Sequence, residues 1–171
     1  RLYTQMLEID STSGRERNLS DFLAEKLQTG ADRVERFDVE SMADDVPEGC
    51  GVPQNLLFSW GNPRVVFCTH LDTVPPYIPP TFIGDGMLQH SDSDECARGS
   101  AAGRGTCDAK GQIFAMWEAC KALEAKGNTD FGLLLLAGEE TGSFGAKAFD
   151  AMMADGSCSL VNSDNGHKSD L

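Results

Sequence analysis

Four short segments of the 171-residue chain carry side chains that could bind a metal ion or move a proton. Each follows a predicted strand or precedes a predicted helix, and they contain His70-Leu71-Asp72, Asp108, Glu139-Glu140 and Ser163-Asp164. In open α/β sheets, sites form at the carboxyl ends of the strands. One histidine and several carboxylates are therefore expected to converge on one edge of a sheet.

His70 and Asp72 stand two residues apart, and in an extended segment such residues point to the same side. His70 could bind a metal through one ring nitrogen while Asp72 accepts the N–H of the other. That contact would fix the tautomer and make the imidazole a better donor. The alternative is an ordinary histidine near a turn, but the other three segments favour the metal site.

Asp108 lies in GRGTCDAKG, where glycines let the backbone approach closely. A carboxylate at such a place can bridge two divalent ions about 3.5–4 Å apart. The alternative is an N-cap for the helix expected to start near Gly111. A phosphate loop is excluded, because the segment matches neither G-x-x-x-x-G-K-[ST] nor G-x-G-x-x-G.

Glu139 and Glu140 follow the apolar run FGLLLLA. In an extended segment, adjacent side chains point to opposite sides, so the two carboxylates would do different work. One could bind a metal, and the other could take a proton from the metal-bound water, whose pKa the metal lowers to about 7. The alternative is an acidic pair that stabilises the start of the next helix.

The remaining sequence supplies the elements that must position these side chains. Helices are expected at 2–9, 16–27 (capped by Ser11 or Ser13), 111–125 and 143–154. Strands are expected at 34–39, 55–60, 64–69, 131–137 and 159–162, with 64–69 central in the sheet. Residues 75–103 are rich in Pro, Gly, Ser and Asp and predict a long loop. The alternation of strands and helices predicts an α/β fold, with a mostly parallel sheet flanked by helices.

The amino-acid composition limits the classes of binding partner that the chain could have. The net charge of −13, from 27 acidic and 14 basic residues, argues against nucleic acid or an anionic membrane surface. No apolar run approaches the ~20 residues of a membrane span. The six cysteines form no C-x-x-C pair and do not resemble a disulfide framework, so free thiols in a cytoplasmic protein are expected.

Taken together, THLDTVP, GRGTCDAKG and GEETGS resemble the co-catalytic zinc peptidases, the family of acetylornithine deacetylase, succinyl-diaminopimelate desuccinylase, aminoacylase and carboxypeptidase G. The segment LEIDSTSGRE resembles the family's opening helix and turn. The acetylornithine deacetylase-like branch is the most similar. The resemblance implies hydrolysis of the amide bond of an N-acyl amino acid by a metal-bound hydroxide. A di- or tripeptidase and a non-catalytic metal-binding fragment are the alternatives.

The resemblance also implies a role for each matching residue. His70 would bind one zinc ion and be oriented by Asp72, and Asp108 would bridge both ions, with the following peptide often cis. Glu139 would be the general base, and Glu140 would be a ligand of the second zinc. A complete site would hold two Zn²⁺ ions, although Co²⁺ or Mn²⁺ can occupy such donor sets.

The last part of the chain departs from the family pattern. Asp164 stands where the family has the acidic residue of G-E-P-T, so it is expected to bind the first zinc, and His167 or Asp170 could substitute. Residues 1–171 are expected to be the N-terminal portion of a catalytic domain. The lid or dimerisation domain and the C-terminal part with the last histidine ligand are expected to be absent, and the full-length protein is expected to be a homodimer.

Overall fold

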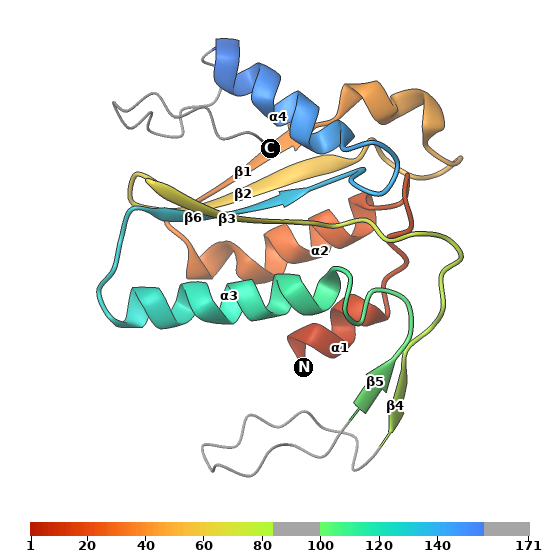
Figure 1. The fold of residues 1–171 in the computed structure, drawn as a ribbon, viewed down its shortest axis with the longest axis horizontal. Coiled ribbons are helices and arrows are strands. Elements are labelled where there is room, and N and C mark those ends of the chain that lie inside the picture. The colour runs from red at the N-terminus through yellow and green to blue at the C-terminus, as the bar shows by residue number, and fades with distance from the viewer. Residues whose placement is uncertain (84–99, 156–171) are drawn as a thin grey trace.

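A computed structural model describes residues 1–83 and 100–155 of the chain (Figure 1). The main sheet has the strand order β1-β2-β6-β3, with β1 (Arg33–Asp38), β2 (Gln54–Trp60), β6 (Phe131–Leu136) and β3 (Val65–His70). The helices are α1 (Leu2–Leu7), α2 (Arg17–Leu27), α3 (Lys110–Ala125) and α4 (Phe144–Asp155), with short 3-10 helices at Gln28–Gly30 and Glu40–Asp45. The strand expected at 159–162 lies outside the described residues.

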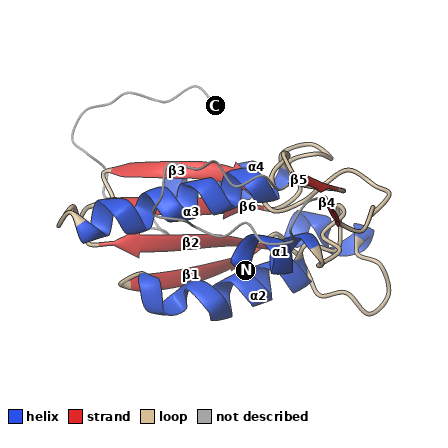
Figure 2. Cartoon of the chain, turned by 90° about the horizontal axis from the view of Figure 1, so that it is seen from below, coloured by secondary structure: helices blue, strands red, loops and turns tan. Residues whose placement is uncertain are grey.

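The helices cover both faces of the sheet. Figures 1 and 2 show α1, α2 and α3 on one face and α4 on the other. Leu133 and Leu135 of β6 belong to the core under α2 and α3, whereas Leu134 and Leu136 pack with Phe149 of α4. Because successive strand residues point to opposite faces, β6 is buried on both sides. This explains why its sequence is a continuous apolar run.

Aromatic packing fixes α3, and with it the segment that carries Asp108. Trp117 of α3 is buried, with ring centroids 5.9 Å from Phe58 and 5.7 Å from Trp60 of β2. Ile113, one turn earlier on α3, is fully buried in the same core. The start of the helix is therefore held against the sheet edge where β3 ends.

The predicted α/β fold with a helix-flanked sheet is confirmed, but the strand directions are mixed. β3 and β6 are parallel, whereas β1–β2 and β2–β6 are antiparallel. A parallel pair needs a crossover, which α3 supplies between β3 and β6. The links from β1 to β2 and from β2 to β3 include no such crossing helix. A mostly parallel sheet is therefore wrong for the described strands.

Two other expectations need correction. Within the described sheet β3 pairs only with β6, and Val65 is 60% exposed, so β3 is not central there. Its apolar run reflects the covering of its two faces, because Val66 and Phe67 pack into the cores on opposite sides. Residues 75–103, expected to be loop, contain a small antiparallel pair of strands, β4 (Thr81–Ile83) and β5 (Ser100–Ala102).

None of the helices in the described ranges combines the length and apolarity that a bilayer crossing requires.

Candidate metal centre

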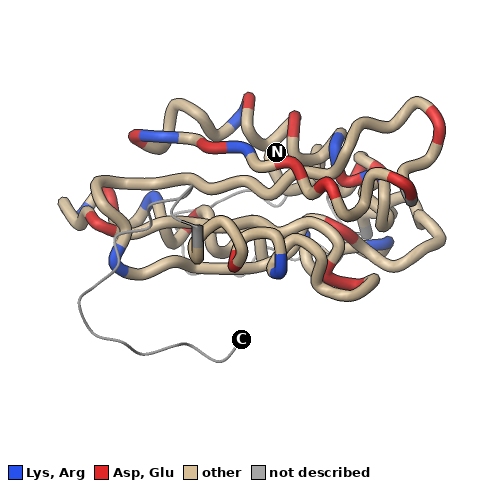
Figure 3. Tube along the Cα trace, turned by 90° about the horizontal axis from the view of Figure 1, so that it is seen from above, with Lys and Arg blue, Asp and Glu red and all other residues tan. Residues whose placement is uncertain are grey.

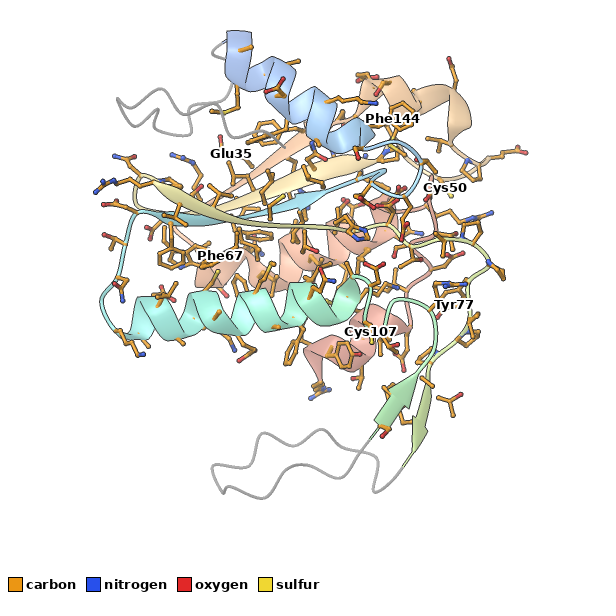
Figure 4. The ribbon with its side chains drawn as sticks, in the orientation of Figure 1. Glu35, Cys50, Phe67, Tyr77, Cys107 and Phe144 are labelled. Atoms are coloured by element: carbon orange, nitrogen blue, oxygen red, sulfur yellow. The ribbon has the colours of Figure 1, made fainter. Side chains whose placement is uncertain are left out.

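Three loops meet at the edge of the sheet where β3 and β6 end (Figure 1). One follows β3, one follows β6, and the third leads into α3. In Figure 4, Cys107 marks the loop before α3, and Phe144 marks the start of α4, directly after the turn that follows β6. The parallel pairing of β3 with β6 brings His70 opposite Leu136, so the residues after both strands emerge side by side.

His70, Asp108 and Glu140 come together at this edge. Their nitrogen and oxygen donor atoms all lie within 4.8 Å of one another. His70 Nε2 is 3.0 Å from Asp108 Oδ1. The His70 side chain is 11% exposed and that of Asp108 is 65% exposed, so the cluster is anchored on one side and open on the other. One imidazole and two carboxylates form a donor set that suits zinc.

The remaining metal-ligand candidates lie elsewhere in the chain. Asp164, together with its possible substitutes His167 and Asp170, falls outside the described residues.

The hydrogen bonds of His70 define its tautomer. His70 Nδ1 is 3.0 Å from the backbone carbonyl oxygen of Asp72 and 3.4 Å from Asp72 Oδ1. A carbonyl oxygen only accepts, so Nδ1 carries the hydrogen. In the neutral ring, Nε2 then presents its lone pair towards Asp108. The sequence predicted that the Asp72 carboxylate would accept this N–H, and the backbone carbonyl is the nearer acceptor.

The Asp72 carboxylate connects His70 to the turn that carries the two glutamates. It is fully buried and accepts hydrogen bonds from the backbone N–H groups of Glu139 and Glu140 and from Ser13 Oγ, each at 3.0 Å. Burial by itself would raise the pKa of Asp72. The His70 ring and these donors outweigh burial and lower its pKa. Asp72 is therefore a buried anion that fixes the backbone on both sides of the cluster.

The charges in the cluster perturb one another. Burial lowers the pKa of His70, but hydrogen bonds to Asp72 and Asp108 and their negative charges outweigh burial and raise it from 6.5 to about 9. Burial raises the pKa of Glu140, and the charges of Asp108, Asp72 and Glu139 add to the rise against the charge of His70. The excess of carboxylates over cations here favours a bound cation.

Glu139 and Glu140 lie in a turn, not in an extended segment. The Glu139 carbonyl oxygen accepts hydrogen bonds from the N–H groups of Gly142 at 3.2 Å and Ser143 at 3.1 Å. Gly138 has a φ of 65°, which L residues rarely adopt. The expected extended geometry is therefore wrong, because Asp72 binds both successive N–H groups and bends the chain. The two side chains still differ: Glu140 joins the cluster, and Glu139 is exposed.

Asp108 does not cap α3. The N-cap residue of that helix is Ala109, which makes no side-chain capping hydrogen bond. The peptide bond between Asp108 and Ala109 is cis, as the resemblance implied.

The capping role expected for Ser11 or Ser13 is wrong. The N-cap residue of α2 is Glu16, without a side-chain capping hydrogen bond. Ser11 Oγ donates to the Leu71 carbonyl at 2.9 Å, and Ser13 Oγ donates to Asp72 Oδ2 at 3.0 Å. Only the likeness of LEIDSTSGRE to the family's opening turn hinted at this contribution.

Two further residues that the sequence did not single out hold the loops of the cluster. The fully buried Lys110 donates from Nζ to the Ile9 carbonyl and so ties the start of α3 to the segment just after α1. Asn55 of β2 accepts from the Ala137 N–H at 3.0 Å and donates to the Gly145 carbonyl at 2.8 Å. Asn55 thereby clamps both ends of the glutamate turn.

Acidic positions lie along the loops at this end of the molecule. Figure 3 shows Asp and Glu on several of these loops, with fewer Lys and Arg among them. The chain as a whole carries a net charge of −13. A cation approaching this edge would therefore meet an attractive field.

Comparison with known proteins identifies the family. Residues 66–168, which contain all three motifs, match the model of peptidase family M20/M25/M40. The chain belongs to this family. Within it, a probable carboxypeptidase of Aspergillus fumigatus is 32% identical over 154 residues, covering 86% of this chain and 34% of the relative. A peptidase M20 domain-containing protein of Schizosaccharomyces pombe is 33% identical over 152 residues, covering 85% and 33%.

Solved structures of similar fold support the architecture. A tripeptidase of Staphylococcus aureus gives a TM-score of 0.63 at 21% identity, covering 95% of this chain and 40% of that one. Human carnosine dipeptidase 1 gives 0.60 at 21% identity, covering 90% and 34%. The aminopeptidase PepT of Bacillus cereus gives 0.55 at 26% identity, covering 85% and 37%. The chain spans about a third of the length of the curated M20/M25/M40 relatives that it matches.

Proposed function

We propose that the full-length protein containing this chain is a metal-dependent peptidase that hydrolyses an amide bond of short peptides. The observation that carries the proposal is the convergence of His70, Asp108 and Glu140, whose donor atoms lie within 4.8 Å of one another. The buried Asp72 stands behind this cluster and the exposed Glu139 beside it. Membership of the M20/M25/M40 peptidases agrees with such a site.

The residues present fit a divalent cation. Neutral imidazole nitrogen and carboxylate oxygen are ligands of Zn²⁺, and Co²⁺ or Mn²⁺ accept the same donors. We propose that His70, Asp108 and Glu140 would be ligands of the metal, with Asp164 as a further ligand from the last part of the chain. A bound divalent ion supplies a water of lowered pKa and polarises the carbonyl to be attacked.

The chain's own residues divide the remaining work. Glu139 is exposed and adjacent to the ligand Glu140, so its carboxylate is free to take a proton from the attacking water and deliver it to the leaving amine. Asp72 accepts hydrogen bonds from the backbone of both glutamates and keeps them in place. The carbonyl of Asp72 holds His70 in the tautomer that directs Nε2 at the cluster.

Two substrate classes follow from different observations. The printed names of the similar proteins, which include a probable carboxypeptidase, a tripeptidase and a dipeptidase, favour short peptides. The motifs THLDTVP, GRGTCDAKG and GEETGS resemble those of the acetylornithine deacetylase-like branch, which makes N-acyl amino acids the second candidate substrate class. Both classes present a planar amide carbonyl to the same centre.

The free thiols of the four described cysteines, Cys50, Cys68, Cys107 and Cys120, support a cytoplasmic location as part of this proposal.

The test is an amidase assay of the full-length protein with added Zn²⁺, Co²⁺ or Mn²⁺. Dipeptides, tripeptides and N-acetyl amino acids are compared as substrates, with and without a chelator. Glu139→Gln is expected to bind metal normally and to lose at least ~100-fold in kcat, since general base catalysis contributes typically 10²–10⁴-fold. Glu124→Gln, an exposed change on α3, is the control and is expected to keep full activity.

Hydrolysis of peptides in preference to N-acetyl amino acids would support the first substrate class, and the reverse would support the second. Hydrolysis that survives complete metal removal, or a Glu139→Gln variant with full activity, would refute the proposed mechanism.

A further inference from the structure

A ring of three hydrogen bonds closes the base of the turn that carries Glu139 and Glu140. The Gly145 N–H donates to the Ala137 carbonyl at 2.9 Å. Asn55 of β2 completes the ring, because its Oδ1 accepts from the Ala137 N–H at 3.0 Å and its Nδ2 donates to the Gly145 carbonyl at 2.8 Å. Ala137 directly follows β6, and Gly145 lies in the first turn of α4. The ring therefore joins β2 to the end of β6 and the start of α4.

The ring is buried and closely packed. Asn55 and Ala137 are 0% exposed, and Gly145 is also buried. A Cβ added at Gly145 would lie 2.4 Å from both the Ala137 carbonyl oxygen and Asn55 Oδ1. Because these groups are shielded from solvent, loss of the Asn55 amide would leave the Ala137 N–H and the Gly145 carbonyl each without a partner that Asn55 now supplies.

An amide is the side chain that this position requires. One of its terminal atoms must accept from an N–H while the other donates to a carbonyl, and the neutral amide of Asn55 does both. Leu57, two residues along β2 and therefore on the same face, packs with Phe149 of α4. A side chain that only filled this core would be apolar, since burying a polar group is costly unless it is hydrogen-bonded.

Asn55 and Asp72 hold the same turn at different places. Asp72 accepts from the N–H groups of Glu139 and Glu140, in the middle of the turn. Asn55 binds the two ends, so without it the turn could pivot about the bonds to Asp72. A bound metal would restrain Glu140, whereas Glu139 lies outside the donor cluster and is exposed. Loss of Asn55 should therefore displace Glu139 more than Glu140.

We propose that Asn55 is a positioning residue for the proposed hydrolysis: it fixes both ends of the turn and so holds Glu139 where it can exchange a proton with the attacking water. This inference rests on the proposed function. Asn55 acts through the backbone of the turn and not by contact with the substrate. A displacement of about 1 Å caused by a change away from the chemistry can cost on the order of 100-fold in rate.

The test compares two substitutions of Asn55 in the full-length protein. Asn55→Ala removes both bonds to the turn. Asn55→Asp keeps the shape and is assayed at alkaline pH, where the carboxylate can accept from the Ala137 N–H but cannot donate to the Gly145 carbonyl. Gln54→Ala is the matched control, because Gln54 is also a buried amide of β2, but its Nε2 donates to Asp38 of β1 at 2.6 Å.

The measurements are kcat per bound Zn²⁺, KM, Zn²⁺ affinity, thermal stability, and hydrogen exchange at residues 137–145 of the metal-free protein. We expect Asn55→Ala to lose about 10–100-fold in kcat, with KM within about threefold and Zn²⁺ affinity within about tenfold of the wild type. Exchange at residues 137–145 should rise. Asn55→Asp should lose at least about tenfold in kcat.

The control separates positioning from a general loss of stability. Gln54→Ala should keep kcat within about threefold of the wild type, even where it lowers thermal stability, because its hydrogen bond lies away from the turn. A purely structural role for Asn55 would lower the thermal stability of both alanine variants and leave the kcat of the folded protein unchanged.

Two results would overturn the inference. One is an Asn55→Ala protein with wild-type kcat, and the other is a Gln54→Ala protein that loses as much kcat as Asn55→Ala. If Asn55→Ala does not fold, the shape-conserving Asn55→Asp decides the question, and wild-type kcat in that variant would overturn it. If the wild type hydrolyses no amide, the proposed function fails, and exchange at residues 137–145 still decides whether Asn55 holds the turn.

Discussion

Replacing Asp72 by Asn is the most informative single change, because the two side chains have the same shape. Each carboxylate oxygen has partners: Oδ1 accepts from Glu139 N–H at 3.0 Å and lies 3.4 Å from His70 Nδ1, and Oδ2 accepts from Ser13 Oγ and Glu140 N–H at 3.0 Å. Asn supplies one acceptor oxygen and one NH₂ donor, so one of these two pairs of donors must face another donor.

The less costly orientation of the new side-chain amide sets the expected loss in free energy of unfolding. With the NH₂ at Oδ2, the Ser13 hydroxyl can rotate and accept from it, but the Glu140 N–H cannot. One buried donor left unsatisfied costs about 1–3 kcal/mol. The opposite orientation leaves both the Glu139 N–H and His70 Nδ1–H facing NH₂, and costs more. Asp72→Asn should therefore lower the free energy of unfolding by about 1–3 kcal/mol. Displacement of the Glu140 backbone should weaken Zn²⁺ binding by about 10–100-fold.

The assay is urea unfolding of the metal-free full-length protein, followed by Zn²⁺ titration. Asp130→Asn is the matched control: Asp130 also accepts a backbone N–H, that of Asn62 at 3.0 Å, but it is exposed and precedes β6, at the end away from the cluster. Its φ of 65° suits Asn. The control should change stability by at most about 0.5 kcal/mol and leave Zn²⁺ affinity unchanged. Equal effects of the two substitutions would refute the role given to Asp72.

Three further results are expected. In the metal-free protein the pKa of His70 is raised from 6.5 to about 9, so its stabilising contribution is complete below pH 6.5 and is lost as the pH rises through 9. The difference in urea midpoint between wild type and His70→Gln should therefore shrink over this window. A constant difference would contradict the interaction of His70 with Asp72 and Asp108. Metal binding requires neutral His70, so Zn²⁺ affinity should fall as pH drops below about 9, with protons released on binding in calorimetry in buffers of different ionisation enthalpy. Gly138→Ala should lower the free energy of unfolding more than Gly127→Ala. Both glycines have positive φ, but an added Cβ would lie 2.5 Å from Met42 Sδ at Gly138, whereas at Gly127 it would meet nothing within 4 Å. Equal losses of about 1 kcal/mol in unfolding measurements would mean that only backbone strain matters.

The elements that bury apolar runs were predictable from the sequence. The runs and periodicities at 54–60, 110–125 and 131–136 give the strands and the helix close to their observed bounds. The meeting of His70, Asp108 and Glu140 was also expected, because strand ends on one edge bring their following residues together.

Features that depend on distant partners were not predictable. Ser11 and Ser13 have the side chains of helix caps, and only the fold shows that their hydroxyls bond to residues about 60 positions away. The bend at Glu139 and Glu140 depends on Asp72, which the local sequence does not reveal. Glu16 resembles an ordinary helix-start residue in the sequence, and only the fold shows that its side chain is fully buried.

Anomalous diffraction at the zinc absorption edge tests whether His70, Asp108 and Glu140 hold a catalytic divalent ion. The crystals are of the full-length protein grown with Zn²⁺. We expect an anomalous peak about 2.0–2.2 Å from His70 Nε2 and from a carboxylate oxygen of Asp108. A zinc-saturated crystal with no peak at this cluster, or with zinc bound only at other residues, would contradict it.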